Sequence, residues 1–142
     1  MRHVIFLPGL AMAALTFVVM FVMYYRRIAQ MKRDRIHPQA VATSAQSAQK
    51  LTDSSAADNF RNLFELPVLF YFALVMAALT DQATPVTLGL AWLFVIARIA
   101  HSAIHCTYNK VMHRFRAFLL GALALIALWG SLGYGVLIGH AA

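Results

Sequence analysis

The sequence predicts an all-α membrane protein, a bundle of four transmembrane helices. Hydrophobic residues make up 61% of the chain and charged residues 12%, which leaves too little polar surface to coat a water-soluble domain. Four apolar runs have about the 20 residues that crossing a bilayer core requires. The 142 residues are therefore expected to form one domain, residues 1–142.

The first apolar run predicts a helix over about 4–25, which ends where Arg26 and Arg27 begin a basic stretch. Its apolar residues continue without a polar cleavage region, so we interpret it as a retained span and not as a signal peptide. The other helices are expected at about 58–80, 87–108 and 114–138.

The connections between these runs differ in length and composition. The segment of about 26–57 is rich in Ala, Ser, Gln and Thr, so it is expected to be a flexible loop or a solvated extension of the second helix. Ser55 and Asp58 have the spacing of a capping box, which predicts that a helix starts there. Asp81 and Pro85 predict a tight turn before the third helix.

Lys and Arg concentrate around two of the connections. Seven surround the first loop and three surround the third, which is ten of the twelve in the chain: Arg26, Arg27, Lys32, Arg33, Arg35, Lys50, Arg61, Lys110, Arg114 and Arg116. Because cytoplasmic loops collect these residues, loops 1 and 3 are expected in the cytoplasm and both termini outside. Topology and attraction to anionic membrane lipids then explain the basic charge, and no nucleic-acid partner is expected.

Polar residues recur at helical spacing inside two of the apolar spans. They predict one polar face on the second helix and one on the third: Asp58, Arg61, Asn62 and Glu65, then Arg98, His101, Ser102, His105 and Asn109. Both faces lie near the cytoplasmic end, so they can meet. One interpretation is structural, with an ion pair, a snorkelling arginine and hydrogen-bonded histidines. The other is an anionic ligand, because arginines outnumber the obvious carboxylate partners.

These residues resemble the MAPEG superfamily, membrane-associated proteins of eicosanoid and glutathione metabolism with relatives in bacteria. The resemblance rests on the run Arg61-Asn62-Leu63-Phe64-Glu65-Leu66-Pro67, on Arg98-Ile99-Ala100-His101 and on Arg114, and it extends in order and spacing over all four helices. It implies a homotrimer in a bacterial inner membrane, with glutathione between subunits near the cytoplasmic face.

The resemblance also implies roles for individual residues. Arg61 and Arg98 would bind the glutathione carboxylates, Glu65 the ammonium group, and Asn62 the peptide portion. His101 and His105 would line the same pocket, and one or more arginines of the first helix would reach in: Arg26, Arg27 or Arg33.

Arg114 matches the family position that stabilises the glutathione thiolate, the nucleophile that would attack a lipophilic small molecule. This predicts a glutathione-dependent transferase or peroxidase. Phe115, Phe118 and His105 stand where some members carry hydroxyl-bearing residues. A non-catalytic protein that binds lipid or glutathione is therefore a second hypothesis.

A third hypothesis is a haem or metal site on His101 and His105 beside Cys106, with His113 nearby. Histidine pairs on one helix more often pack or form hydrogen bonds, so the preferred prediction contains no metal. A purely structural bundle, closed by the small residues Gly135 and Gly139, is the remaining alternative.

Overall fold

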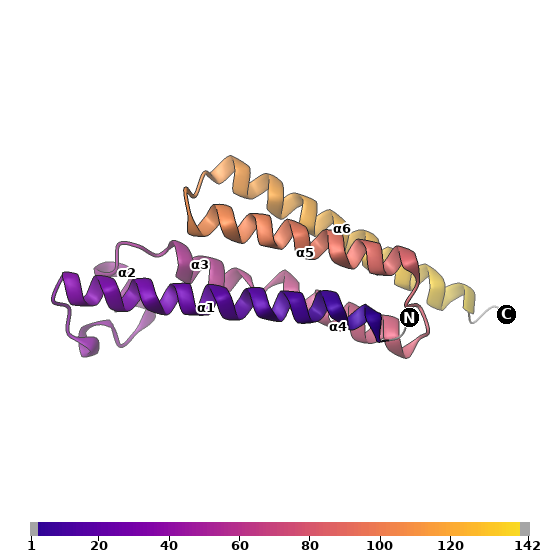
Figure 1. Ribbon diagram of the computed structural model, residues 1–142, viewed down its shortest axis with the longest axis horizontal. Helices are drawn as coiled ribbons and strands as arrows, with labels where there is room; N and C mark the ends of the chain where they lie inside the picture. Colours follow the sequence, from indigo (N-terminus) through magenta and orange to yellow (C-terminus); the bar gives the residue numbers. More distant parts are fainter. Residues whose placement is uncertain (1–2, 140–142) are drawn as a thin grey trace.

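The computed structural model describes residues 3–139, and this part of the chain is helical and has no strand (Figure 1). The elements in chain order are η1 (Val4–Phe6), α1 (Leu7–Arg33), η2 (Pro38–Val41), α2 (Ser44–Lys50), α3 (Ser55–Asn62), α4 (Leu66–Leu79), α5 (Pro85–Cys106) and α6 (Val111–Gly139).

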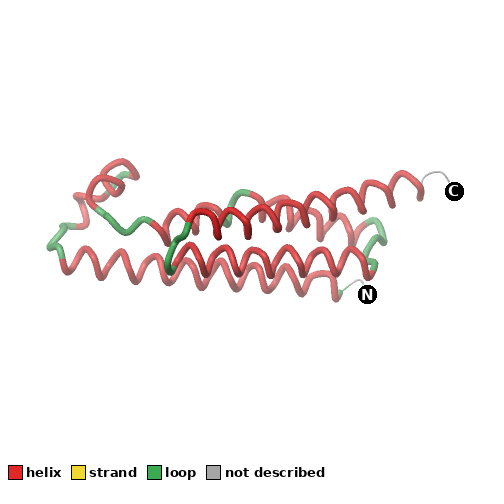
Figure 2. The backbone as a smooth tube through the Cα atoms, turned by 90° about the horizontal axis from the view of Figure 1, so that it is seen from above, coloured by secondary structure: helices red, strands yellow, loops and turns green. Residues whose placement is uncertain are grey.

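The long helices lie side by side and form an elongated bundle. α1 runs against α3 and α4, and α5 packs most extensively against α6. The start of η1 and the end of α6 lie at the end of the bundle that carries the α4–α5 turn, while the α1–α3 connection and the α5–α6 turn lie toward the other end (Figures 1 and 2).

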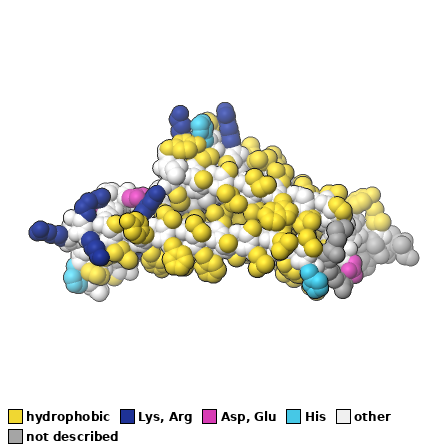
Figure 3. Space-filling model, viewed as in Figure 1, with side chains coloured by type: hydrophobic (Ala, Val, Ile, Leu, Met, Phe, Trp, Pro, Cys, Tyr) yellow, Lys and Arg dark blue, Asp and Glu magenta, His cyan; other side chains and the backbone are white. Residues whose placement is uncertain are grey.

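Four helical stretches are long and apolar enough to cross a membrane, which confirms the predicted fold class: Val4–Arg33, Ser55–Leu79, Pro85–Cys106 and Val111–Ile138. Large apolar side chains cover the outside of the bundle, and Lys and Arg gather on the side of the loops that connect α1 to α3 and α5 to α6 (Figure 3). A surface of this kind is stable in lipid, where apolar side chains face hydrocarbon.

The second span differs from the continuous helix that the sequence predicts. It consists of α3 and α4, separated at residues 63–65. The cause is Pro67, at the start of α4. Proline has no N–H, and its ring clashes with the carbonyl four residues earlier, here that of Leu63, so the regular helix cannot run through this position.

The connection between the first two spans is more ordered than the composition predicts. α1 continues to Arg33, and the short α2 begins with a capping box in which Thr43 and Gln46 exchange hydrogen bonds. The box predicted at Ser55 does not form. Ser54 is the residue before α3, and its Oγ donates to Asp58 Oδ2 at 2.8 Å.

Aromatic and small side chains form the interior of the bundle. The rings of Phe70 on α4 and Phe94 on α5 stack with centroids 4.5 Å apart, and both are fully buried. Gly121 brings α6 close to α5, because a Cβ there would lie 3.5 Å from the Cβ of Ala97. Gly135 instead accommodates the Gln82 side chain from the α4–α5 turn, so its predicted helix-packing role is not the one that the structure shows.

Candidate functional site

A row of buried polar residues follows one face of α5 over its second half. Arg98, His101, Ser102 and His105 are each at most 4% exposed, although they lie in a membrane-spanning helix. Their spacing is that of one helical face, and this face is turned toward α3 and the start of α6. The row matches the part of the predicted polar stripe that ends at His105.

Arg98 is the largest fully buried side chain in the part of the chain that the structure describes. Its Nη2 donates to the backbone carbonyl of Asn62 at 3.1 Å. Its Nε and Nη1 have no hydrogen-bond partner among residues 3–139, and neither has the Oδ1 atom of Asn62. Guanidinium remains protonated in proteins, so the site holds a buried cation with free donors beside a free amide acceptor.

His101 connects α5 to α6. Its Nδ1 lies 3.2 Å from the backbone carbonyl of Arg114. A carbonyl can only accept, so Nδ1 carries the proton and, in the neutral ring, Nε2 presents a lone pair. That Nε2 is buried and has no partner among the described residues, and the same is true of Nδ1 of His105. The two rings are nearly perpendicular, with centroids 5.5 Å apart.

Arg114 lies at the edge of this cluster, in the first turns of α6. Its Nη1 donates to Asn109 Oδ1 at 2.7 Å, and Asn109 has a positive φ of 46° in the α5–α6 turn. Asparagine tolerates this conformation better than most residues. The His101 bond to its carbonyl therefore ties Arg114 to the cluster through the backbone, while its guanidinium points to the turn.

Arg61 and Glu65 lie outside the buried cluster. Arg61 is exposed and forms an ion pair of 3.9 Å with Asp58, whose side chain is 47% exposed. Glu65 lies in the break at 63–65 and is exposed, and its carboxylate interacts electrostatically with Arg98. A single chain thus brings together Asn62, Arg98, His101 and His105, and leaves the other two groups at the surface.

Sequence reasoning did not identify Asn59 as part of the site. This side chain is fully buried. Its Oδ1 accepts from Ser102 Oγ at 3.2 Å, and its Nδ2 donates to Cys106 Sγ at 3.4 Å. An amide three residues before Asn62, in an apolar span, is the signal that could have indicated it.

Among the arginines of α1, Arg26 reaches α5. Its Nη2 donates to the backbone carbonyl of Cys106 at the end of that helix, and its Nη1 donates to Ser55 Oγ at 3.3 Å. Lone carbonyls at a helix end attract cations. Arg33 instead binds Asp34 next to it in the chain.

The residues proposed for a haem or metal do not converge. Within residues 3–139 there is no group of three or more His, Cys, Asp or Glu side chains that could hold a metal ion. His113 contacts the Tyr108 hydroxyl at 3.1 Å, and Cys106 Sγ is bonded to Asn59. The two buried histidines come from a single helix.

Comparison with curated proteins and with solved structures found no match. A model of the MAPEG family matches residues 5–134, which include nearly all of the four spans and every residue of the buried cluster. The chain therefore belongs to the MAPEG family.

Proposed function

We propose that the protein is a membrane-bound, glutathione-dependent transferase or peroxidase that acts on a lipophilic electrophile. The MAPEG family includes enzymes of this kind. The observation that carries the proposal is the buried guanidinium of Arg98, whose Nε and Nη1 have no partner among the described residues. A buried cation in a membrane span is unfavourable unless an anion pairs with it, and glutathione supplies carboxylates.

The proposed assignment follows the chemistry of glutathione, which has two carboxylates, one ammonium group and a peptide portion. Arg98 and Arg61 bind the carboxylates. Glu65 binds the ammonium group, and the free Oδ1 of Asn62 accepts from a peptide N–H. His101 and His105 present their free ring nitrogens to the same ligand.

We further propose that the site is completed in a homotrimer. Arg61 and Glu65 are exposed in one chain, while Arg98 and Asn62 are directed inward. A ligand held between subunits can meet both sets, because a neighbouring chain covers the surface that carries the exposed pair. α1 and α6 expose apolar side chains, along which a lipophilic substrate can reach the site from the bilayer.

Arg114 is the proposed catalytic residue. The thiolate of glutathione is the attacking species, and a guanidinium beside the sulfur favours loss of the thiol proton. The N-terminal end of α6 carries a partial positive charge, which also favours the thiolate. The hydrogen bond from His101 to the Arg114 carbonyl holds this residue near the cluster, and release of the Asn109 contact would free the guanidinium for sulfur.

The proposed orientation puts the loop ends of the bundle in the cytoplasm of a bacterial cell and both termini outside. The excess of Lys and Arg at those loops supports it. Glutathione would then reach the site from the cytoplasm, because the cluster lies in the half of α5 that ends at the α5–α6 turn.

The test is glutathione binding and thiolate absorbance of the detergent-solubilised protein, for the wild type and for Arg114→Ala. The variant is expected to keep binding within about threefold and to lose the thiolate signal, with turnover reduced by roughly 10²–10³-fold, as for other lost electrostatic stabilisers. Arg116→Ala, which removes an exposed arginine of the same helix, is the matched control.

Absence of glutathione binding by the wild type would refute this function. Binding without thiolate formation or turnover would instead establish the second candidate, a non-catalytic binding protein. The contact of Arg114 with Asn109 favours that candidate, since it occupies one nitrogen of the guanidinium. A Soret band in the absorption spectrum of the purified protein would show that it binds haem.

A further inference from the structure

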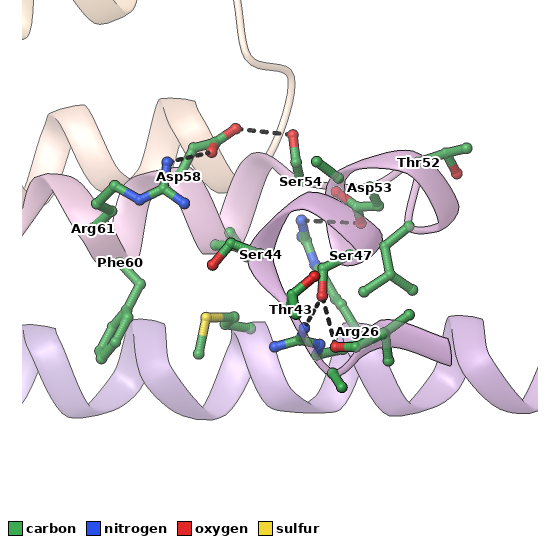
Figure 4. A pocket seen from close by; sticks show the side chains of 18 of the residues that line it. Arg26, Thr43, Ser44, Ser47, Thr52, Asp53, Ser54, Asp58, Phe60 and Arg61 are labelled. Atoms are coloured by element: carbon green, nitrogen blue, oxygen red, sulfur yellow. Dashed lines mark hydrogen bonds and ion pairs between the residues drawn. The ribbon is translucent and has the colours of Figure 1, made fainter. Parts of the chain in front are cut away.

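A second polar region lies at the loop end of the bundle, between α1, α2 and α3. It is a cavity of about 760 Å³, whose lining includes the guanidinium groups of Arg26, Arg27 and Arg61 and the hydroxyls of Thr43, Ser44, Ser47 and Ser54 (Figure 4). Its wall on the side of α2 belongs to the segment that the sequence alone predicts to be a flexible loop or a solvated helix extension.

Side-chain contacts hold that segment against α1. Nη2 of Arg27 donates to Ser47 Oγ in α2. Gln30, which is 5% exposed, donates to Thr52 Oγ1 at 3.0 Å and accepts from the backbone N–H of Asp53 at 3.4 Å. The cavity is therefore a defined feature of the fold and not a gap beside a free loop.

Each of the two long walls of the cavity, on α1 and on α3, has an apolar side chain toward the middle of its span. On α1, Met23 lies toward the middle of the span and Arg26 toward the loop end. α3 runs in the opposite direction (Figure 1), so Ser54 lies toward the loop end and Phe60 toward the middle. Both walls thus have an apolar side chain toward the middle of the span, and on α3 the exposed Arg61 directly follows Phe60.

The apolar wall continues toward the membrane interior. The rings of Phe60 and Phe64 meet edge to face with centroids 5.1 Å apart. Phe64 is 57% exposed and immediately precedes α4, the inner half of the same span. A hydrocarbon chain that starts in the cavity can follow this wall toward the middle of the second span.

The lining of the cavity has an excess of cations. Three arginines and two aspartates line it. The pairs Arg26–Asp53 and Arg61–Asp58 are long, at 3.8 and 3.9 Å. Arg27 has a hydroxyl partner and forms no ion pair with any carboxylate that the structure describes. A single negative charge on a ligand would balance this set.

We propose that this cavity binds an anionic phospholipid of the surrounding membrane. The phosphodiester lies between Arg27, Arg26 and the Ser47 hydroxyl, and the acyl chains lie along Phe60 and Phe64. The cavity lies outside the buried cluster of α5, although Arg26 of its lining donates to the end of that helix. The family resemblance would direct Arg26 or Arg27 to glutathione, so the test includes glutathione as a competitor. Arg61 lines the cavity and also belongs to the glutathione proposal, so the test leaves it unchanged.

The test measures lipid dissociation constants by native mass spectrometry of the full chain in neutral detergent. The probes are dioleoyl phosphatidylglycerol and dioleoyl phosphatidylcholine. The wild type is expected to bind phosphatidylglycerol about tenfold more tightly, the effect of one charge-assisted contact. Arg27→Gln should reduce this preference to about twofold or less, whereas Lys32→Gln, which removes the same charge from the exposed surface of α1, should retain it.

A second variant keeps the test informative if Arg27→Gln does not fold. Ala57 lines the cavity, and Ala57→Phe should weaken both lipids by filling it. Equal binding of the two lipids by the wild type would overturn the proposal, as would an equal loss of preference in Arg27→Gln and Lys32→Gln. Inorganic phosphate that binds as tightly as the lipid would identify a free anion as the ligand. Displacement of the lipid by glutathione would show that the cavity is part of the glutathione site. Both of these results, with phosphate or with glutathione, would also overturn the proposal.

Discussion

Replacing Arg98 by Met separates the effect of this side chain on the stability of the protein from its effect on ligand binding. The guanidinium is fully buried and makes one hydrogen bond, 3.1 Å from Nη2 to the Asn62 carbonyl. A charged residue at the centre of a spanning helix costs about 2.5–3.5 kcal/mol. A hydrogen bond from a charged donor contributes about 1.5–3 kcal/mol. The Met variant is therefore expected to be as stable as the wild type or more stable, by roughly 0–2 kcal/mol.

The same substitution should impair ligand binding. If Arg98 binds a glutathione carboxylate, its loss removes a charge-assisted contact, and the dissociation constant should rise by about 10- to 150-fold. Unfolding in denaturing detergent measures the first effect and calorimetric titration with glutathione measures the second. Arg116→Met is the control, because that arginine is exposed and a surface change should alter stability by less than about 0.5 kcal/mol.

Two outcomes would contradict the reasoning about Arg98. A loss of several kcal/mol of stability with unchanged glutathione binding would show that the guanidinium has a structural partner, such as a second chain or an ordered water. Unchanged stability with unchanged binding would show that its free Nε and Nη1 face no ligand.

Further predictions concern the two ends of the bundle. Gly135→Ala should displace the Gln82 side chain at a cost of less than about 1 kcal/mol, because the new Cβ meets only the amide end of that flexible side chain; a larger loss of stability that Gln82→Ala does not relieve would contradict this contact. The pKa of the Asp34 carboxyl lies below its usual value, mainly because Arg33 Nε donates a hydrogen bond to it and secondly because Gln30 Nε2 does so. The stabilisation is complete above the unfolded pKa and is lost as pH falls through the folded one. Hydrogen-exchange protection factors at the end of α1, which are corrected for the intrinsic pH dependence of exchange, should therefore fall in acid, and an equal fall in Asp34→Asn would refute this cause.

Part of the site follows from local sequence. Arg98, His101 and His105 recur at helical spacing in an apolar run, and this period predicts one shared face in any helix. The structure shows that face buried. The second helix shows where such reasoning ends. The same period predicts that Asn62 and Glu65 share a face, but the helix is interrupted at residues 63–65, and Glu65 is exposed while Oδ1 of Asn62 is buried.

The sequence by itself determined the class of the protein, the number of its spans and the loops that carry the basic residues. These features depend on composition and on runs of about 20 residues. Only the tertiary structure decided which polar groups are buried, because burial depends on neighbours that are distant in the chain. Arg98 and Arg61 both lie in spans, yet α3 covers Arg98 while the side chain of Arg61 is 73% exposed. The cavity between α1, α2 and α3 has the same origin, since its walls come from segments about 20–40 residues apart.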